Sequence, residues 1–154
     1  MREWINNRYG TNFDEEDLTN IKDFSLIWNV FEDNICGNNF SIQSLQQGLV
    51  NRNIDSNLFQ EHLDYFKNRY VNAGAFTHRF QFLYFRNNDR QQLVEDVLLG
   101  VNNNSNDKIL AIAIIVYRFR NNLFHGLKEI QHIDQQNKNF KVANRFLTTL
   151  IDNF

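Results

Sequence analysis

Hydrophobic residues return every three or four positions along most of the chain, which is the spacing of one face of an amphipathic helix. In the first half of the sequence this pattern predicts three helices, over 14–35, 41–50 and 55–71. Asp14 or Asp17 is placed to cap the first helix, and Gly37 to end it. Ser41 is placed to cap the second, and Gly74 follows the third as a stop.

The aromatic-rich stretch 76–85 is ambiguous, because alternate rings suit a strand while the same residues also fit a helix. The helical periodicity on both sides favours a helix. Asp89 and Gln92 then have the spacing of a capping box. They predict the start of a helix over 90–99, which Gly100 ends.

The strongest helical pattern begins after Asp107, its predicted cap, and runs over 108–132. A last amphipathic helix is expected over 137–151. Together the patterns predict an all-α fold, an antiparallel bundle of five to six helices without internal repeats. A chain of 154 residues suffices for one hydrophobic core, so we expect a single domain over 1–154.

Composition narrows the classes of function. A net charge of -2 excludes a uniformly basic nucleic-acid clamp but allows a local basic patch. The one cysteine, Cys36, offers neither an internal disulfide nor a cysteine zinc cluster, which favours a reducing compartment. The longest apolar run, 109–117, is far shorter than the ~20 residues that span a bilayer, and 1–7 does not resemble a signal peptide. We therefore expect a cytoplasmic protein that makes no membrane contact.

The chemistry lies in the segment from Arg118 to Gly126, where the apolar helix gives way to two arginines, two asparagines and a histidine. Helical geometry places Arg118, Asn121 and His125 on one polar stripe and Arg120 at the border of the core. A solvated helix face is the simple alternative. Gly126 argues against it, because a glycine inside a helix costs about 1 kcal/mol relative to alanine and implies the close approach of a helix or ligand.

The run from Arg120 to His125 resembles the signature of the HEPN (higher eukaryotes and prokaryotes nucleotide-binding) superfamily. In that signature an arginine and a histidine are separated by four to six residues, and a polar residue, often asparagine, follows the arginine. The segment 23–32 is similar to the opening helix of some members. The family is a small helical bundle, and many of its members are metal-independent endoribonucleases.

The resemblance implies that Arg120 and His125 are the catalytic pair and that Asn121 orients them. Arg118 is the rival phosphate-binding arginine, and Asn122 is a further candidate. Glu32 either points into the same cleft or is solvated. An arginine can bind a phosphodiester through two parallel hydrogen bonds, and a histidine can move the protons of the 2′-OH and of the leaving oxygen.

The implied reaction uses the 2′-OH of RNA and yields a 2′,3′-cyclic phosphate, in a toxin–antitoxin, antiviral or stress system. The family pattern also implies a homodimer whose two copies form one composite site, and an antitoxin or sensor protein as a partner. We expect no cofactor, and no metal, because the sequence around His62, His78 and His132 shows no acidic residue at metal-ligand spacing except Glu61 and Asp64 near His62, which are too loosely spaced. Some members carry a modifiable tyrosine where this chain has Leu127.

Two other interpretations remain open. The chain is then either an inactive HEPN-like module that binds RNA or a nucleotide, or an unrelated helical interaction protein. Separately, the rings of 76–85 with Arg79, Arg86 and Arg90 either stack bases and hold an RNA backbone or fill the core beside solvated arginines.

Overall fold

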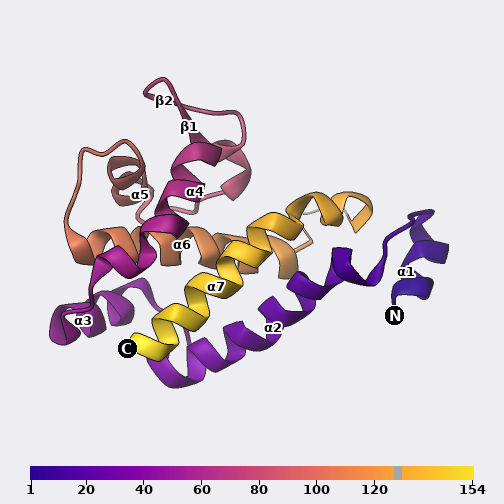
Figure 1. The fold of residues 1–154 in the computed structure, drawn as a ribbon, viewed down its shortest axis with the longest axis horizontal. Helices are drawn as coiled ribbons and strands as arrows, with labels where there is room; N and C mark the ends of the chain where they lie inside the picture. Colours follow the sequence, from indigo (N-terminus) through magenta and orange to yellow (C-terminus); the bar gives the residue numbers. More distant parts are fainter. Residues whose placement is uncertain (127–129) are drawn as a thin grey trace.

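The computed structural model describes residues 1–126 and 130–154, without the side chain of Gln131. Within these ranges the chain is mostly helical, with one very short hairpin (Figure 1). Its elements are, in order, α1 (Arg2–Tyr9), α2 (Glu15–Cys36), α3 (Ile42–Arg52), η1 (Ser56–Phe59), α4 (Gln60–Tyr70), β1 (Val71–Asn72), β2 (Ala75–Phe76), η2 (Phe80–Leu83), α5 (Gln91–Leu98), α6 (Ser105–Phe124), η3 (Ile130–Gln136) and α7 (Asn137–Asn153). The elements marked η are 3₁₀ helices.

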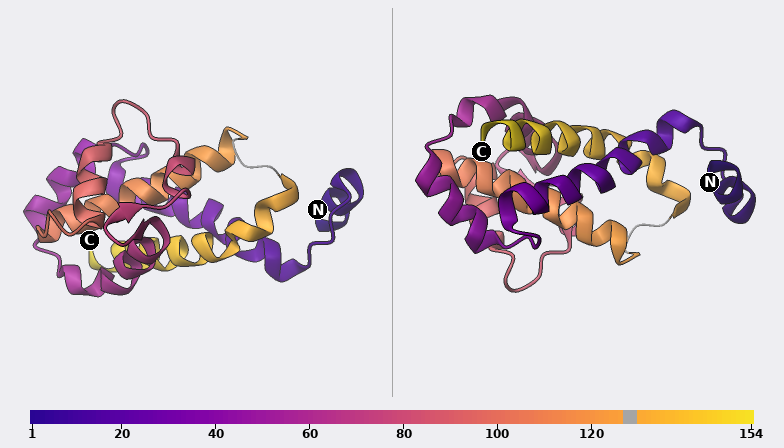
Figure 2. Two further views of the ribbon diagram at one scale, coloured as in Figure 1. Left: turned by 90° about the horizontal axis from the view of Figure 1, so that it is seen from above. Right: turned by 90° about the horizontal axis from the view of Figure 1, so that it is seen from below.

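Helix α6 is the centre of the fold. Every residue over 109–116 is buried, as expected of a helix that is apolar on all sides. Helices α3 and α5 pack against it, and α2 and α7 lie along each other (Figures 1 and 2). Phe24, Phe119 and Phe140 join α2, α6 and α7 through ring contacts. The predicted all-α character is confirmed for the described residues.

The directions of the helices differ in part from the predicted antiparallel arrangement. The N-terminal ends of α2 and α7 are neighbours, because Asn20 bonds to both Asn137 and Asn144. From there both helices run in the same direction, so they are parallel (Figure 1). Helix α6 runs against them, since its C-terminal Phe119 contacts Phe140 near the start of α7.

The sequence patterns did not predict α1, whereas local capping explains why α2 and α3 begin where the sequence places them. The Asp14 side chain accepts a hydrogen bond from the Asp17 backbone N–H, and the Asp17 carboxylate accepts one from the Asp14 backbone N–H, which closes a capping box. Gly37 ends α2 with a left-handed φ of 61°. The Ser41 side chain caps α3, as predicted. The helix expected over 55–71 is present as η1 followed by α4.

The helix expected over 76–85 is wrong. Gly74, at a φ of 77°, turns the chain so that β1 pairs with β2, and only η2 makes one 3₁₀ turn. Phe80 packs between the rings of Phe76 and Phe85, at centroid distances of 4.2 and 5.5 Å. These rings gain their contacts across a folded-back loop, so helical spacing did not determine the local structure.

The capping role expected of Asp89 is also wrong. Arg90 is the cap position of α5 and makes no side-chain capping bond. The Asp89 carboxylate instead accepts a hydrogen bond from the Arg86 backbone at 2.7 Å and turns into the protein, where only 6% of the residue is exposed.

The single helix expected over 108–132 is wrong at both ends. Asn104 rather than Asp107 is the cap, because its side chain accepts from the Asp107 backbone. At the other end α6 stops at Phe124, and Gly126 takes a φ of 66°. Gly126 is thus a helix stop, and a Cβ added there would meet no atom within 4 Å. Residues 127–129 of the expected helix lie outside the described part, and η3 follows as a separate element.

Nowhere in the described ranges is a helix both long and apolar enough to cross a membrane.

Candidate functional site

Arg118 lies in the interior of the protein. Its side chain has no exposed surface, and its Nη1 forms an ion pair with the Asp89 carboxylate at 3.0 Å. Its Nε donates a hydrogen bond to the Leu83 carbonyl at 3.1 Å. Burial lowers the pKa of Arg118, and the charge of Asp89 opposes that decrease. Arg118 is therefore occupied by structural contacts inside the fold.

Asn122 belongs to the same buried group. Its Nδ2 donates to the carbonyl oxygens of Phe82 and Leu83, each at 3.2 Å, and its Oδ1 accepts from Arg118 Nη2 at 3.4 Å. Arg118 and Asn122 are one helical turn apart on α6. Together they fasten η2 to α6.

Arg120 is half-buried and is held by two neighbours on its own helix. Its Nη1 donates to Asn121 Oδ1 at 3.2 Å, and its guanidinium lies 5.1 Å from the centre of the Phe124 ring. The Nε of Arg120 is buried without a hydrogen-bond partner among the described residues. Asn121, which is 3% exposed, thus fixes the orientation of the guanidinium. Whether it does so for catalysis stays a prediction.

His125 is exposed and directly follows the last residue of α6. Its backbone nitrogen donates to the Asn121 carbonyl at 2.9 Å, so Asn121 contacts both members of the predicted pair. The interpretation of this segment as a solvated face is wrong for Arg118, Asn121 and Asn122, which are buried. The exposed polar group that remains is the His125 imidazole.

Glu32 lies near the end of α2 and is half-buried. Its carboxylate accepts a hydrogen bond from the Phe40 backbone at 3.2 Å. Among the described residues this bond ties Glu32 to the connection between α2 and α3, rather than to Arg120 or His125.

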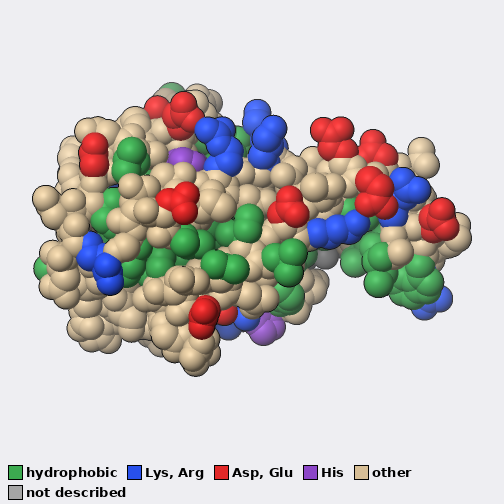
Figure 3. Space-filling view, turned by 60° about the horizontal axis from the view of Figure 1, so that its bottom comes forward, with side chains coloured by type: hydrophobic (Ala, Val, Ile, Leu, Met, Phe, Trp, Pro, Cys, Tyr) green, Lys and Arg blue, Asp and Glu red, His purple; other side chains and the backbone are tan. Residues whose placement is uncertain are grey.

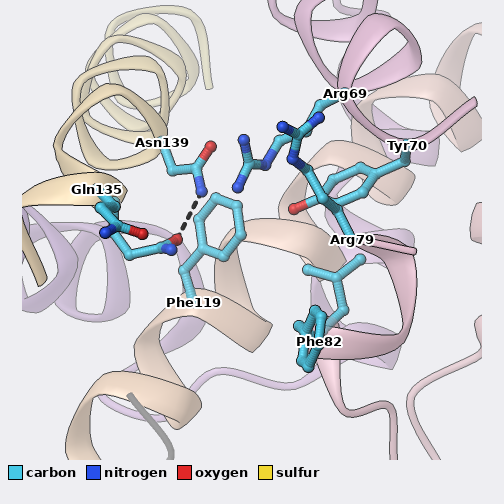
Figure 4. Close-up of a pocket in the computed structure, with 9 residues that line it drawn as sticks. Arg69, Tyr70, Arg79, Phe82, Phe119, Gln135 and Asn139 are labelled. Carbon is cyan, nitrogen blue, oxygen red and sulfur yellow. Dashed lines mark hydrogen bonds between the residues drawn. The ribbon is translucent and has the colours of Figure 1, made fainter. Parts of the chain in front are cut away.

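A pocket of about 330 Å³ opens beside α6 (Figure 4). Four elements meet there, α4, η2, α6 and the junction of η3 with α7. Figure 4 shows Arg69, Arg79 and Asn139 on the wall of this pocket, with one arginine guanidinium directed toward the Asn139 amide. The lining residues are Arg69, Tyr70, Arg79, Phe82, Leu83, Phe119, Gln135, Gln136 and Asn139.

The amide groups of this pocket are ordered by a hydrogen-bond chain. Tyr65 donates its hydroxyl to Asn139 Oδ1 at 2.7 Å, and Asn139 Nδ2 donates to Gln136 Oε1 at 2.7 Å. Burial raises the pKa of Tyr65 and of Tyr70, and the nearby Arg69 opposes this increase. Both phenols are therefore neutral near pH 7.

Sequence reasoning singled out Arg79 in the aromatic stretch but missed Arg69 and Asn139. Arg79 lines the pocket, whereas Arg86 is exposed and Arg90 bonds to the side chain of Gln46. Of the rings nearby, Phe80 is buried and Phe82 is 43% exposed. The burial of Phe80 agrees with rings that fill the core, and the binding of RNA by this stretch stays a prediction. No local signal joins Arg69 to Asn139, because they meet only when α4 packs on α7.

Within the described part of the chain, no three His, Cys, Asp or Glu side chains come together in a group able to hold a metal ion. Comparison of the chain with protein-family models, with curated proteins and with solved structures gives no match. The motif residues and the geometry around them are therefore the features of this chain that point to a function.

Proposed function

We propose that this chain is a metal-independent endoribonuclease of the HEPN type, with Arg120 and His125 as its catalytic pair. One observation carries the proposal. Arg120, fixed by Asn121, and the exposed His125 occupy the last turn and the end of α6, while Arg118 is taken up by Asp89. This arrangement favours Arg120 over Arg118 as the arginine that meets a phosphate.

The chemistry follows from these two side chains. Neutral His125 takes the proton of an RNA 2′-OH, and the freed 2′ oxygen attacks the adjacent phosphorus. The bond from phosphorus to the 5′ oxygen breaks, and a protonated imidazole donates a proton to that leaving oxygen. Arg120 holds the non-bridging oxygens and stabilises their added charge. The products are a 2′,3′-cyclic phosphate and a 5′-OH.

The test is incubation of the purified protein with a labelled RNA in EDTA. We expect cleavage that persists in the chelator, with cyclic phosphate ends detected by mass spectrometry. A DNA of the same sequence is the matched control and stays intact, because it lacks the 2′-OH nucleophile. RNA left whole, or products that carry a 5′-phosphate, would contradict the proposal.

A homodimer with a composite site is part of this proposal, because the reaction needs both a base and an acid. Each copy supplies one His125, so two copies supply both roles. Exposed apolar side chains support an association: Leu26 and Val30 on α2 are 68% and 47% exposed, and Phe124 on α6 is 58% exposed. Figure 3 shows hydrophobic side chains gathered on one face of the molecule. A restraining antitoxin or sensor protein is proposed as a further partner.

We expect Leu26→Glu to weaken dimerisation and RNA cleavage together, because it places a charge among the exposed apolar side chains proposed to make the contact. Light scattering and the cleavage assay, run at one protein concentration, measure both effects. Val50→Glu is the matched control, since Val50 is as exposed as Leu26, at 67%, but lies on α3 and is not among the proposed contact residues. A wild-type monomer that cleaves at full rate would refute the composite site and leave the catalytic residues standing.

A module that binds RNA or a nucleotide without cutting is the second candidate. The specific observation in its favour is the pocket that Arg69 and Arg79 line. RNA that binds but is never cleaved in the assay above would select this candidate.

A further inference from the structure

We infer that the pocket between α4, η2, α6 and α7 binds the phosphate group of a nucleotide. The inference goes beyond the proposed cleavage, because the lining residues include neither Arg120 nor His125, and it gives the second candidate function its ligand group. It would hold for an inactive protein as well.

The pocket carries positive charge that no acidic residue of its lining neutralises. Arg69 and Arg79 both line the pocket, and no acidic residue is among the lining residues. In the described part of the chain, neither arginine forms an ion pair, whereas Arg118 pairs with Asp89 and Arg145 with Glu61. Two positive charges that share a concave surface attract an anion more strongly than two solvated ones do.

Arg69 also brings hydrogen-bond donors to the pocket that it lines. Tyr65 and Tyr70 lie beside its guanidinium and hold it in the pocket wall. A phosphate oxygen is a suitable acceptor, since it is charged and the guanidinium presents several N–H groups in one plane. The neutral Tyr70 phenol adds a further donor at the same wall.

An exposed ring and several amide groups at the pocket indicate that the phosphate belongs to a nucleotide. The Phe82 ring lies at the pocket and is 43% exposed, so a base can stack on it. Amide groups of Gln135, Gln136 and Asn139 offer donors and acceptors of the kind that base edges bond. The volume of about 330 Å³ falls at the lower end of the range for small-molecule sites, roughly 300–1,000 Å³.

A free nucleoside monophosphate and a nucleotide within RNA offer the same chemistry, and the experiment separates them. Isothermal titration calorimetry at low salt would use inorganic phosphate, AMP, adenosine and a short single-stranded RNA as probes. The His125→Ala protein is used for the RNA arm, so that cleavage does not disturb the measurement. We expect AMP to bind and adenosine to bind at least roughly tenfold more weakly, because the phosphate supplies the charged hydrogen bonds.

Three variants locate the site. Arg79→Gln removes one charge from an exposed side chain, so it leaves the core intact. Arg69→Gln removes the other, and Arg145→Gln is the matched control on the surface of α7. We expect Arg79→Gln and Arg69→Gln each to weaken AMP binding about tenfold and the control to change it less than about twofold.

Each outcome of these titrations either supports or overturns nucleotide binding at the pocket. If Arg79→Gln and Arg69→Gln weaken the binding of both AMP and RNA, the pocket binds the nucleotide whether it is free or part of RNA. If they weaken the binding of RNA alone, the pocket binds the RNA backbone. Equal binding of AMP and adenosine, or an equal loss in Arg145→Gln, overturns the inference. So does wild-type binding of AMP and RNA by a folded Arg79→Gln protein. Because the readout is binding, failure of the cleavage assay would leave this result unaffected.

Discussion

The substitution His125→Ala is expected to lower the rate of RNA cleavage by about 10²–10⁴-fold, the usual contribution of a general acid or base. His125 is exposed, and the hydrogen bond at this residue is made by its backbone, so the fold should persist. Single-turnover cleavage of a labelled RNA measures the rate. Thermal unfolding should show a change in stability within about 0.5 kcal/mol.

The controls for this experiment are a second histidine and the paired arginine. His78 is also exposed, and His78→Ala should cleave at the wild-type rate. Arg120→Lys should be nearly inactive, because an ammonium group cannot form the two parallel bonds of a guanidinium to a phosphate. A folded His125→Ala protein that cleaves RNA at the rate of the wild type would sink the catalytic assignment.

The substitution Arg118→Met is expected to lower the free energy of unfolding by about 3–5 kcal/mol, which is typical when one partner of a buried ion pair is removed. It leaves the Asp89 carboxylate charged in the interior and frees the carbonyl of Leu83 from its bond to Arg118. Denaturant unfolding followed by circular dichroism measures the change. Methionine fills much of the volume, so the loss reports on charge rather than on a large cavity.

Arg145→Met is the matched control for this loss. Arg145 also pairs with a carboxylate, that of Glu61, but both side chains are largely exposed, at 63% and 82%. Such a surface pair contributes at most about 1 kcal/mol. Adding Asp89→Asn to Arg118→Met should recover part of the stability, since the unpaired charge is then gone. A fully stable Arg118→Met protein that has lost cleavage would instead identify Arg118 as the catalytic arginine.

The helices that were predicted well are those whose boundaries depend on neighbouring residues. Asp14, Asp17 and Ser41 satisfy backbone groups within three residues of themselves, and Gly37 ends α2 through its own backbone angle. The order of neighbouring residues is therefore enough to predict where these helices begin and end. The stretch 76–85 failed for the opposite reason, because its rings are held by contacts formed after the hairpin turns the chain back.

For the candidate site, too, the sequence predicted what depends on neighbouring residues and missed what depends on packing. The sequence placed Arg120, Asn121 and His125 close together, because they are near neighbours in the chain at the end of one helix. It could not separate Arg118 from Arg120. That distinction requires Asp89 to reach Arg118 from another element, and the sequence assigned Asp89 to a helix cap.

The all-α character, most helix boundaries and the run of polar residues at the end of α6 could be read from the amino-acid order, because hydrophobic period and capping are local properties. Folding of the whole chain was needed to show that Arg118 is buried in an ion pair and that Arg69 and Arg79 line one pocket. The charge pair and the pocket depend on which elements pack together. Asp89 and Arg118 are 29 positions apart in the sequence and meet only in the folded chain. The pocket likewise forms only where four elements pack together.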